Sequence, residues 1–276
     1  MSILYVVATP IGNIDEINAR ALAVLSEADY IAAEDTRTTG LLLSRLRVAP
    51  SKFISYHKFN ESARQELVLG KLEAGHSVAL VSDAGTPCVS DPGYMLVRAA
   101  ASAGFKVVGV SGSCAVILAL SVSGLPAEPF VFVGFMPRKA VAEAVVCGTT
   151  MVFYESPKRI VATMGVFAEK FPEASICLCN DLTKKFEHIY RGSPGEVLEE
   201  LLANPHAEKG EYTCVAYVPE SAEVSISPIS IEGLLIDTIV KSGCTITMKD
   251  AIKILSADYN KKEVYAASLR LKDMFL

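Results

Sequence analysis

The residues best suited to chemistry lie in one stretch, 80–93, where a short apolar run opens into a polar loop. Its sequence is Leu-Val-Ser-Asp-Ala-Gly-Thr-Pro-Cys-Val-Ser-Asp-Pro-Gly. The apolar run at 78–81 is typical of a buried strand, and a helical pattern resumes at Tyr94. Ligands of open α/β sheets bind outside the carboxyl ends of the strands, so this loop is the first candidate for a binding site. The alternative is a connection that is simply rich in turn-forming residues.

Three further loops of the first half follow predicted strands, and their tips are expected to meet the first loop at one sheet edge. They are Thr-Pro-Ile-Gly-Asn at 9–13, Glu-Asp-Thr-Arg at 34–37 and Ser-Gly-Ser-Cys-Ala at 111–115. Neither Gly-x-x-x-x-Gly-Lys-Ser/Thr nor Gly-x-Gly-x-x-Gly occurs, which argues against a nucleoside triphosphate or nicotinamide enzyme. The small residues favour a ligand held mainly by backbone contacts.

Charged and aromatic residues near these loops are the next candidates. Arg37 either pairs with Asp35 or holds a phosphate or carboxylate in a fork geometry, and both alternatives remain open. Asp83 has no simple local role, whereas Asp91 is expected only to cap the helix that begins near 93. Buried packing is the expected role of three aromatic residues in the second half, with stacking on bases as the alternative. They are Phe135, Tyr154 and Phe186.

Composition limits the class of protein. A chain of 276 residues that is 51% hydrophobic and 21% charged forms one large or two ordinary domains with a real core. No apolar run approaches the length of a membrane span, and the N-terminus lacks the features of a signal peptide. The net charge of −5 argues against a surface that is basic throughout, though not against a local basic face.

Cysteine usage indicates no metal site. The seven Cys and four His are dispersed, and Cys-x-x-Cys is absent, so a zinc site is not expected. Unpaired cysteines that act as small buried hydrophobes suit a reducing cytoplasm. Cys177 and Cys179 are expected to share one face of a strand.

The first half alternates strands and helices. Strands are predicted at 3–8, 30–33, 53–56, 78–81 and 106–110, with helices at 14–28, 38–46, 62–73, 93–103 and 113–123. This order predicts a largely parallel sheet with helices on both faces. Ser62 and Gln65 form a predicted capping box.

A Pro-rich segment at 124–129 separates this half from a second α/β unit. Strands at 130–133, 149–154, 175–180, 186–190 and 212–218, with helices at 157–167 and 194–202, predict a mixed sheet. A second linker at 219–228 precedes a helical tail with a capping box from Thr247 to Asp250. The tail helices 248–255 and 261–271 form either a helix-turn-helix or, as we favour, a packing extension. The predicted domains are 1–123, 129–219 and a helical extension at 229–276.

Five motifs together resemble one family. They are Ala8-Thr9-Pro10-Ile11-Gly12-Asn13, Glu34-Asp35-Thr36-Arg37, the loop Ser82–Gly93, Ser123-Gly124-Leu125-Pro126 and Phe153-Tyr154-Glu155-Ser156-Pro157. In this order they are similar to the ribosomal RNA small subunit methyltransferase I family of the tetrapyrrole methylase-like superfamily, the class III S-adenosylmethionine-dependent methyltransferases. The resemblance covers residues 3 to about 218, and more weakly the tail.

The resemblance implies two α/β domains with S-adenosylmethionine as methyl donor in the cleft between them, and a homodimer. It implies 2′-O-methylation of a cytidine ribose in small-subunit (16S) ribosomal RNA. The implied cofactor contacts are Pro10, Gly85, Thr86, Val89, Ser113, Cys114, Ala115, Tyr154, Leu182, Gly210 and Glu211. The implied substrate contacts are Asp35, Arg37, Lys139 and Lys184. Asp83 and Glu34 would face the reacting ribose, and as carboxylates they are candidate bases for its hydroxyl.

Two departures from the family bear on these expectations. The family's Gly-Pro-Ser-Ala is replaced by Gly112-Ser113-Cys114-Ala115, where the small Cys keeps the expected contact. The segment 140–148 is shorter than in relatives and holds no basic residue, which weakens the attraction for RNA. Methylation of a tetrapyrrole or other small molecule by the same fold, and a non-catalytic RNA-binding module, remain alternatives.

Overall fold

The computed structural model describes residues 2–49, 52–220, 231–241 and 246–274. Contacts divide the chain into two compact units, Met1–Ala222 and Glu223–Leu276. In the described residues, the first unit contains two five-stranded sheets and the second contains three helices. Among the described residues, no helix is both long and apolar enough to cross a membrane.

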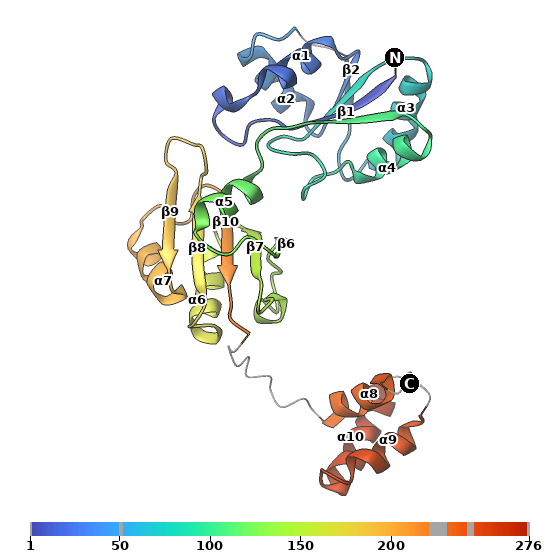
Figure 1. Ribbon diagram of the computed structural model, residues 1–276, viewed down its shortest axis with the longest axis vertical. Coiled ribbons are helices and arrows are strands. Elements are labelled where there is room, and N and C mark those ends of the chain that lie inside the picture. Colours follow the sequence, from blue (N-terminus) through green and yellow to red (C-terminus); the bar gives the residue numbers. More distant parts are fainter. Residues whose placement is uncertain (1, 50–51, 221–230, 242–245, 275–276) are drawn as a thin grey trace. The chain divides into compact units, whose positions relative to one another are not determined.

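The first sheet is entirely parallel, with strand order β3-β2-β4-β1-β5. Figure 1 labels two of its strands, β1 and β2. Its strands are β1 (Ile3–Val7), β2 (Tyr30–Ala33), β3 (Lys52–Ser55), β4 (Val78–Val81) and β5 (Lys106–Val110). The central strand β4 is buried at every residue, because helices cover both faces of the sheet. This confirms the parallel sheet that the alternating pattern predicted.

Side chains of β4 alternate between two cores, as the period of a strand requires. Val78 and Leu80 pack with residues of α3 (Glu61–Glu73) and α4 (Tyr94–Ser102). Ala79 and Val81 pack with residues of α1 (Ala19–Glu27) and α2 (Thr36–Arg45) on the other face. The carboxyl end of β4 is thereby held firmly from both sides, and the loop that follows it starts from a rigid position.

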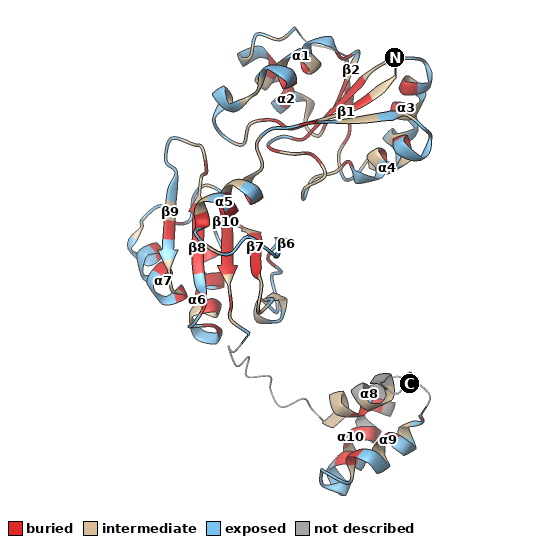
Figure 2. Cartoon of the chain, viewed as in Figure 1, coloured by how far each residue is buried: buried red, intermediate tan, exposed pale blue. Residues whose placement is uncertain are grey.

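The second sheet is mixed, as predicted, with order β6-β7-β10-β8-β9. Only β6 and β7 pair in parallel, and the other pairs are antiparallel. The strands are β6 (Phe130–Phe135), β7 (Thr150–Glu155), β8 (Ser175–Asn180), β9 (His188–Gly192) and β10 (Tyr212–Tyr217). Figure 2 shows the buried central strands of this sheet in red.

Helix α5 (Ala115–Ser123) covers one face of the second sheet, where it packs with residues of β7, β8 and β10. It is apolar around its whole circumference, with a hydrophobic side chain at nearly every position. The other face packs against α6 (Ile160–Lys170) and α7 (Pro194–Ala203). Cys177 and Cys179 lie on the α5 face with their sulfur atoms 3.9 Å apart, which confirms that they share one face.

Several local predictions differ from the structure. The single helix predicted at 14–28 is a 3-10 turn, η1 (Ile14–Glu16), followed by α1, because the side chains of Asn13 and Asn18 each cap a separate start. The capping box at Ser62 is wrong, since α3 begins at Glu61. Asp91 does not cap α4 either, because Gly93 occupies the N-cap position without a side-chain bond.

The second unit consists of α8 (Ile231–Lys241), α9 (Met248–Leu255) and α10 (Lys261–Met274). Its core contains Leu235, Ala251, Leu255, Val264, Ala267 and Leu271, and includes no residue of either sheet. The capping box of Thr247 and Asp250 is confirmed. The predicted linker at 219–228 lies outside the described residues from 221 onward.

Candidate active site

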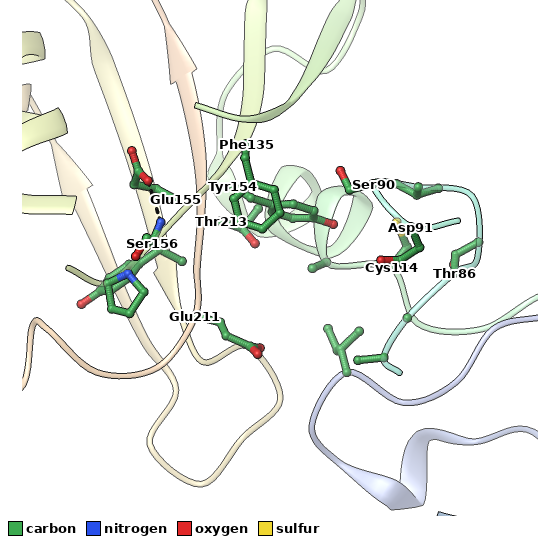
Figure 3. Close-up of a pocket in the computed structure, with 17 residues that line it drawn as sticks. Thr86, Ser90, Asp91, Cys114, Phe135, Tyr154, Glu155, Ser156, Glu211 and Thr213 are labelled. Carbon is green, nitrogen blue, oxygen red and sulfur yellow. Dashed lines mark hydrogen bonds between the residues drawn. The ribbon is translucent and has the colours of Figure 1, made fainter. Parts of the chain in front are cut away.

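A cavity of about 390 Å³ lies at the carboxyl ends of strands from both sheets. The first half of the chain contributes Ile11, residues 84–86 and 89–91, and Cys114 with Ala115 at the start of α5. The second sheet contributes Phe135, residues 154–157 and residues 211–213 (Figure 3). The volume of the cavity lies within the range of about 300–1,000 Å³ that is usual for small-ligand sites.

Hydrogen bonds hold the four predicted loops together at one edge of the first sheet, as their positions after parallel strands predicted. The backbones of Thr9 and Gly85 bond to each other in both directions, at 2.8 and 3.1 Å. The hydroxyl of Thr86 donates to the carbonyl of Ser113 over 2.9 Å. The backbone N–H of Asp35 donates to Asp83 Oδ1 over 3.0 Å. Gly85 has φ of +79°, a conformation that other residues rarely adopt.

Aromatic rings form the part of the cavity wall that comes from β6 and β7. Phe135 and Tyr154 are in edge contact, with ring centroids 5.4 Å apart, and Figure 3 shows both opposite Ser90 and Asp91. Phe135 is 63% exposed and Phe186 is 75% exposed, so the expectation of buried packing is wrong for both. Exposed rings beside a cavity are available to stack on a flat ligand or to contact a cation.

A buried ion pair supports the second-sheet side of the cavity. The Glu155 carboxylate is fully buried and accepts bonds from the Ser156 backbone N–H at 2.6 Å, from the Thr163 hydroxyl at 2.6 Å and from the Arg159 guanidinium. The same guanidinium donates to the carbonyl of Met136 over 2.6 Å. These bonds link the end of β7, the start of α6 and the residue after β6. Tyr154 and Ser156, the neighbours of Glu155 in the chain, line the cavity.

Three carboxyl groups at the edge of the first sheet influence one another. Burial, and then the charge of Asp83, raises the pKa of Glu34. Burial also raises the pKa of Asp83. Burial raises the pKa of Asp91 to about 6, and the charges of Glu34 and Asp83 add to this effect. The structure therefore brings together the two predicted candidate bases, and adds Asp91, which local sequence reasoning had assigned to a helix cap.

Arg37 and Asp35 form the internal pair that was one of two alternatives for them. Arg37 Nε and Nη2 lie 3.1 and 2.7 Å from the two carboxylate oxygens of Asp35. Asp35 also caps α2 by accepting the backbone N–H of Arg37. These bonds lower the pKa of Asp35 well below its usual range. The Arg37 side chain remains 90% exposed, so the outer edge of its guanidinium is open to an anionic group.

Lys184 follows β8 of the second sheet and contacts the loop after β1 of the first sheet. Its ammonium bonds to Asp181 Oδ1 at 2.9 Å and to Glu211 Oε2 at 2.8 Å, and Glu211 lines the cavity. The loop after β1 approaches Lys184 so closely that a Cβ on Gly12 would collide with its side chain. Lys139, the other predicted substrate lysine, is exposed in the connection after β6.

Seven of the predicted cofactor contacts line the cavity. They are Gly85, Thr86, Val89, Cys114, Ala115, Tyr154 and Glu211. The other four are not among the residues that line the cavity. Leu182 is buried among residues that pack on α5, and Gly210 lies against the carboxylate of Asp181. Ser113 presents its carbonyl to Thr86, while Pro10 follows Thr9 in the loop after β1.

The cavity also has lining residues that were not predicted. Ser156 and Pro157 belong to the motif at 153–157, in which only Tyr154 was predicted to contact the cofactor. Tyr212 and Thr213 lie within β10 and carry no local signal, because nothing in a strand's pattern identifies the neighbour of a cavity. Within the described part of the chain, no three His, Cys, Asp or Glu side chains are grouped so as to hold a metal ion.

The lining fits a ligand that carries positive charge and a flat ring. The carboxyl groups of Asp91 and Glu211 face a cavity whose remaining walls are largely apolar or aromatic. Phe135 and Tyr154 provide π faces for a ring or a cation. The backbone of the Gly85 turn supplies groups that can approach a ligand closely.

Comparison with known proteins agrees with this geometry. Residues 3–198 match the family model of tetrapyrrole (corrin/porphyrin) methylases. The chain is 46% identical over 220 residues to the ribosomal RNA small subunit methyltransferase I of Neisseria meningitidis serogroup B, covering 78% of this chain and 75% of that protein. It is 37% identical over 269 residues to the protein of the same name from Pasteurella multocida, covering 95% and 94%.

Solved structures share the fold at low sequence identity. A cobalt precorrin-4 methyltransferase matches with a TM-score of 0.57 and 16% identity, covering 78% of this chain and 94% of that chain. Uroporphyrin-III C-methyltransferase from Thermus thermophilus, in complex with S-adenyl homocysteine, matches with a TM-score of 0.51 and 19% identity, covering 78% and 97%. The predicted resemblance and fold class are therefore confirmed, and this chain belongs to the tetrapyrrole (corrin/porphyrin) methylase family of methyltransferases.

Proposed function

We propose that this protein transfers a methyl group from S-adenosylmethionine to the 2′ oxygen of a cytidine in small-subunit ribosomal RNA. The observation that carries the proposal is the cavity, in which carboxyl groups, aromatic rings and a glycine turn suit a sulfonium nucleoside. The names of relatives that align with up to 95% of the chain support RNA as the substrate. When bound, the cofactor would supply an electrophilic methyl carbon.

The residues divide into donor contacts and supporting residues. The seven predicted residues that line the cavity would contact the donor, together with Asp91 and Phe135. Pro10, Ser113, Leu182 and Gly210 would hold that lining in place. A carboxylate beside a cation gains a favourable interaction, so the acidic lining favours a charged methyl donor over its neutral product.

Asp83 and Glu34 would act on the ribose. Their loops meet at the sheet edge next to the cavity, and their raised pKa values make each ionised carboxylate a better proton acceptor than an exposed one. One of them would accept the proton of the 2′ hydroxyl as the oxygen attacks the methyl carbon. Much of the rate would come from positioning, because the arrangement holds nucleophile and donor together.

Arg37, Asp35, Lys139 and Lys184 would contact the RNA. The exposed edge of the Arg37 guanidinium suits a phosphate oxygen, with Asp35 holding the side chain in place. Lys184 would contact the RNA while its ammonium stays bonded to Glu211, which lines the proposed donor cavity.

The assembly is proposed to be a cytoplasmic homodimer, in which 1–123 and 129–219 act as two domains and 229–276 as a helical extension. Each sheet has helices on its faces, which supports a division into two domains. The free cysteines of the described residues suit a reducing compartment. Light scattering of the purified protein would measure its mass, and a monomer would contradict the dimer.

The decisive test combines a ribosomal substrate with two conservative variants. Small subunits from a strain that lacks this gene would be incubated with donor and enzyme, and mass spectrometry would locate a ribose methyl on a cytidine. Glu34→Gln and Asp83→Asn should lower turnover, by about 10²- to 10⁴-fold for the residue that is the base. Calorimetric titration should show that neither variant changes the affinity for the donor. Glu27→Gln, at an exposed position, is the matched control.

The outcomes separate the alternatives. If both variants keep normal turnover, neither carboxylate is the base. Methylation of uroporphyrinogen without methylation of the small subunit would favour a small-molecule substrate. Binding of RNA without any heat on titration of S-adenosylmethionine would favour a non-catalytic RNA-binding module.

A further inference from the structure

Phe59 is 94% exposed, although the turn that carries it is closed by several hydrogen bonds. It lies in the connection between β3 and α3, and β3 is the neighbour of β2 in the parallel sheet. The turn is therefore at the same sheet edge as Glu34 and Asp83. Single exposed apolar residues are common, so the argument for a role depends on how this turn is built and connected.

The turn is rigid because hydrogen bonds close it from inside. The Asn60 backbone N–H donates to the carbonyl of His57 over 2.9 Å, which closes a four-residue turn. Asn60 Oδ1 accepts the His57 backbone N–H at 2.8 Å, and Asn60 Nδ2 donates to the Ser55 carbonyl over 3.2 Å. Lys58 and Phe59 form the tip, and both side chains are exposed. The backbone that carries the ring is thus held in place, so little backbone freedom would be lost on binding.

The same turn is connected to the active-site loops. Tyr56 is completely buried, and its hydroxyl donates to Glu61 Oε1 over 3.2 Å. That oxygen also accepts the backbone N–H of Gly93, at the end of the glycine-rich loop, over 2.9 Å. His57 is also close enough to Glu34 to interact with its carboxylate, which opposes a small part of the rise in the pKa of Glu34 that burial causes. The position of the Phe59 ring is therefore set relative to the loops that hold the candidate bases.

From this arrangement we propose that Phe59 is a stacking platform for an unpaired base beside the target ribose. The inference rests on the proposed function, since it takes RNA as the substrate. Unpaired RNA bases stack on exposed Phe rings, and every base has a π face that suits such a surface. The neighbouring Lys58 ammonium matches the negative charge of the RNA backbone. The platform would orient the RNA strand and would not contact the methyl donor.

The test compares Phe59→Ala, Phe59→Leu and Phe59→Trp with Leu202→Ala, a control on α7 where the side chain is 67% exposed. Steady-state methylation of small subunits and binding of a short single-stranded RNA would be measured. Phe59→Ala and Phe59→Leu should each raise the KM for RNA and weaken RNA binding by about 5- to 150-fold. Phe59→Trp should restore wild-type binding. Donor affinity, thermal stability and native mass should not change in any variant.

Three results would overturn the proposal. Phe59→Ala could behave as Leu202→Ala does, which would remove any role for the ring. Phe59→Leu could match the wild type, which would indicate an apolar contact with a protein partner instead of stacking. The Phe59 variants could change the native mass, which would place the ring in an interface between copies. A wild-type protein that neither binds nor methylates RNA would instead refute the proposed function, and this inference with it.

Discussion

Asp91 is a half-buried carboxyl group of the cavity, so its ionisation should affect both the stability of the fold and the binding of a cationic ligand. It lines the cavity among other acids, and burial is the main cause that raises its pKa to about 6. The ordinary pKa of an Asp is near 3.8. Between these two values the folded chain binds more protons than the unfolded chain at this position, so the free energy of unfolding falls as pH rises. Above about pH 6 the loss is complete.

Asp91→Asn removes this ionisation and should stabilise the protein at pH 7.5 by about 1 kcal/mol, a figure reduced for partial solvent screening. The gain should be small at pH 4 and should grow until about pH 6.5. Donor affinity should fall, because the cation loses a carboxylate partner. Thermal unfolding between pH 4 and 8, with calorimetric titration of the donor, would measure both effects.

Asp29→Asn provides a control of opposite sign. Hydrogen bonds from Ser77 lower the pKa of Asp29, so its ionised form stabilises the fold and this contribution is lost as pH falls. That variant should lose stability at pH 7.5 instead of gaining it. A gain from Asp91→Asn that did not vary with pH would show that its ionisation is not the cause.

The buried pair of Glu155 and Arg159 should be costly to break. Glu155→Gln leaves the guanidinium without its charged partner in a largely buried position, which costs about 3 kcal/mol or more. Glu169→Gln removes an exposed pair with Lys170 and should change stability by less than about 1 kcal/mol. Urea unfolding would compare the two. Similar losses would mean that the pair beneath Tyr154 contributes no more than a surface contact.

Among the elements, the helix starts show how side-chain bonds select a boundary. Helix α7 begins with a complete capping box, in which Ser193 and Glu196 bond to each other's backbone N–H, and Pro194 follows Ser193. The similar pattern at Ser62 forms no such box, because Asn60 already closes the preceding turn and α3 begins at Glu61. The turn His57–Asn60 therefore decides where this helix starts, with Asn60 at the N-cap position in place of Ser62.

Ser193→Ala should therefore destabilise the protein by about 0.5–2 kcal/mol, since one N-terminal N–H of α7 loses its partner. Ser62→Ala is the matched control, and its effect should lie within about 0.5 kcal/mol of zero. Chemical denaturation of the two variants would separate them. Equal losses would contradict the assignment of the helix start.

The segment 140–148 has a structural reason for its composition. It forms a short 3-10 turn, η2 (Ala142–Ala144), and Val141, Ala142, Ala144, Val145 and Cys147 pack against the core of the second sheet. The segment therefore has apolar residues where it packs on this core, and it contains no basic residue. The attraction for RNA that this segment does not provide must come from other loops, such as those of Arg37 and Lys58.

At the scale of the whole molecule, the two units have separate cores. Every residue that lines the cavity lies between 11 and 213, and the core of the C-terminal unit lies between 235 and 271. A chain truncated to 1–222 should therefore fold and bind S-adenosylmethionine with unchanged affinity. Circular dichroism and calorimetry would test this, and loss of donor binding would show that the helical unit supports the cavity.

Local patterns in the chain were sufficient for most of the elements. Short apolar runs, and helical spacing between them, predicted both sheets and the parallel or mixed character of each. Loops rich in Gly, Pro and Asp after these strands predicted where a ligand would bind. These features depend on backbone hydrogen bonding and on alternation of side chains within a few residues, so a short window of residues contains the relevant information.

Contacts between distant segments decided the remaining features. The pKa of Asp91 depends on burial and on Glu34, which is far away in the chain. The exposure of Phe59, Phe135 and Phe186 depends on which surfaces the packing leaves uncovered. Burial and electrostatic fields are sums over neighbours in space, and no local pattern of residue types records who those neighbours are.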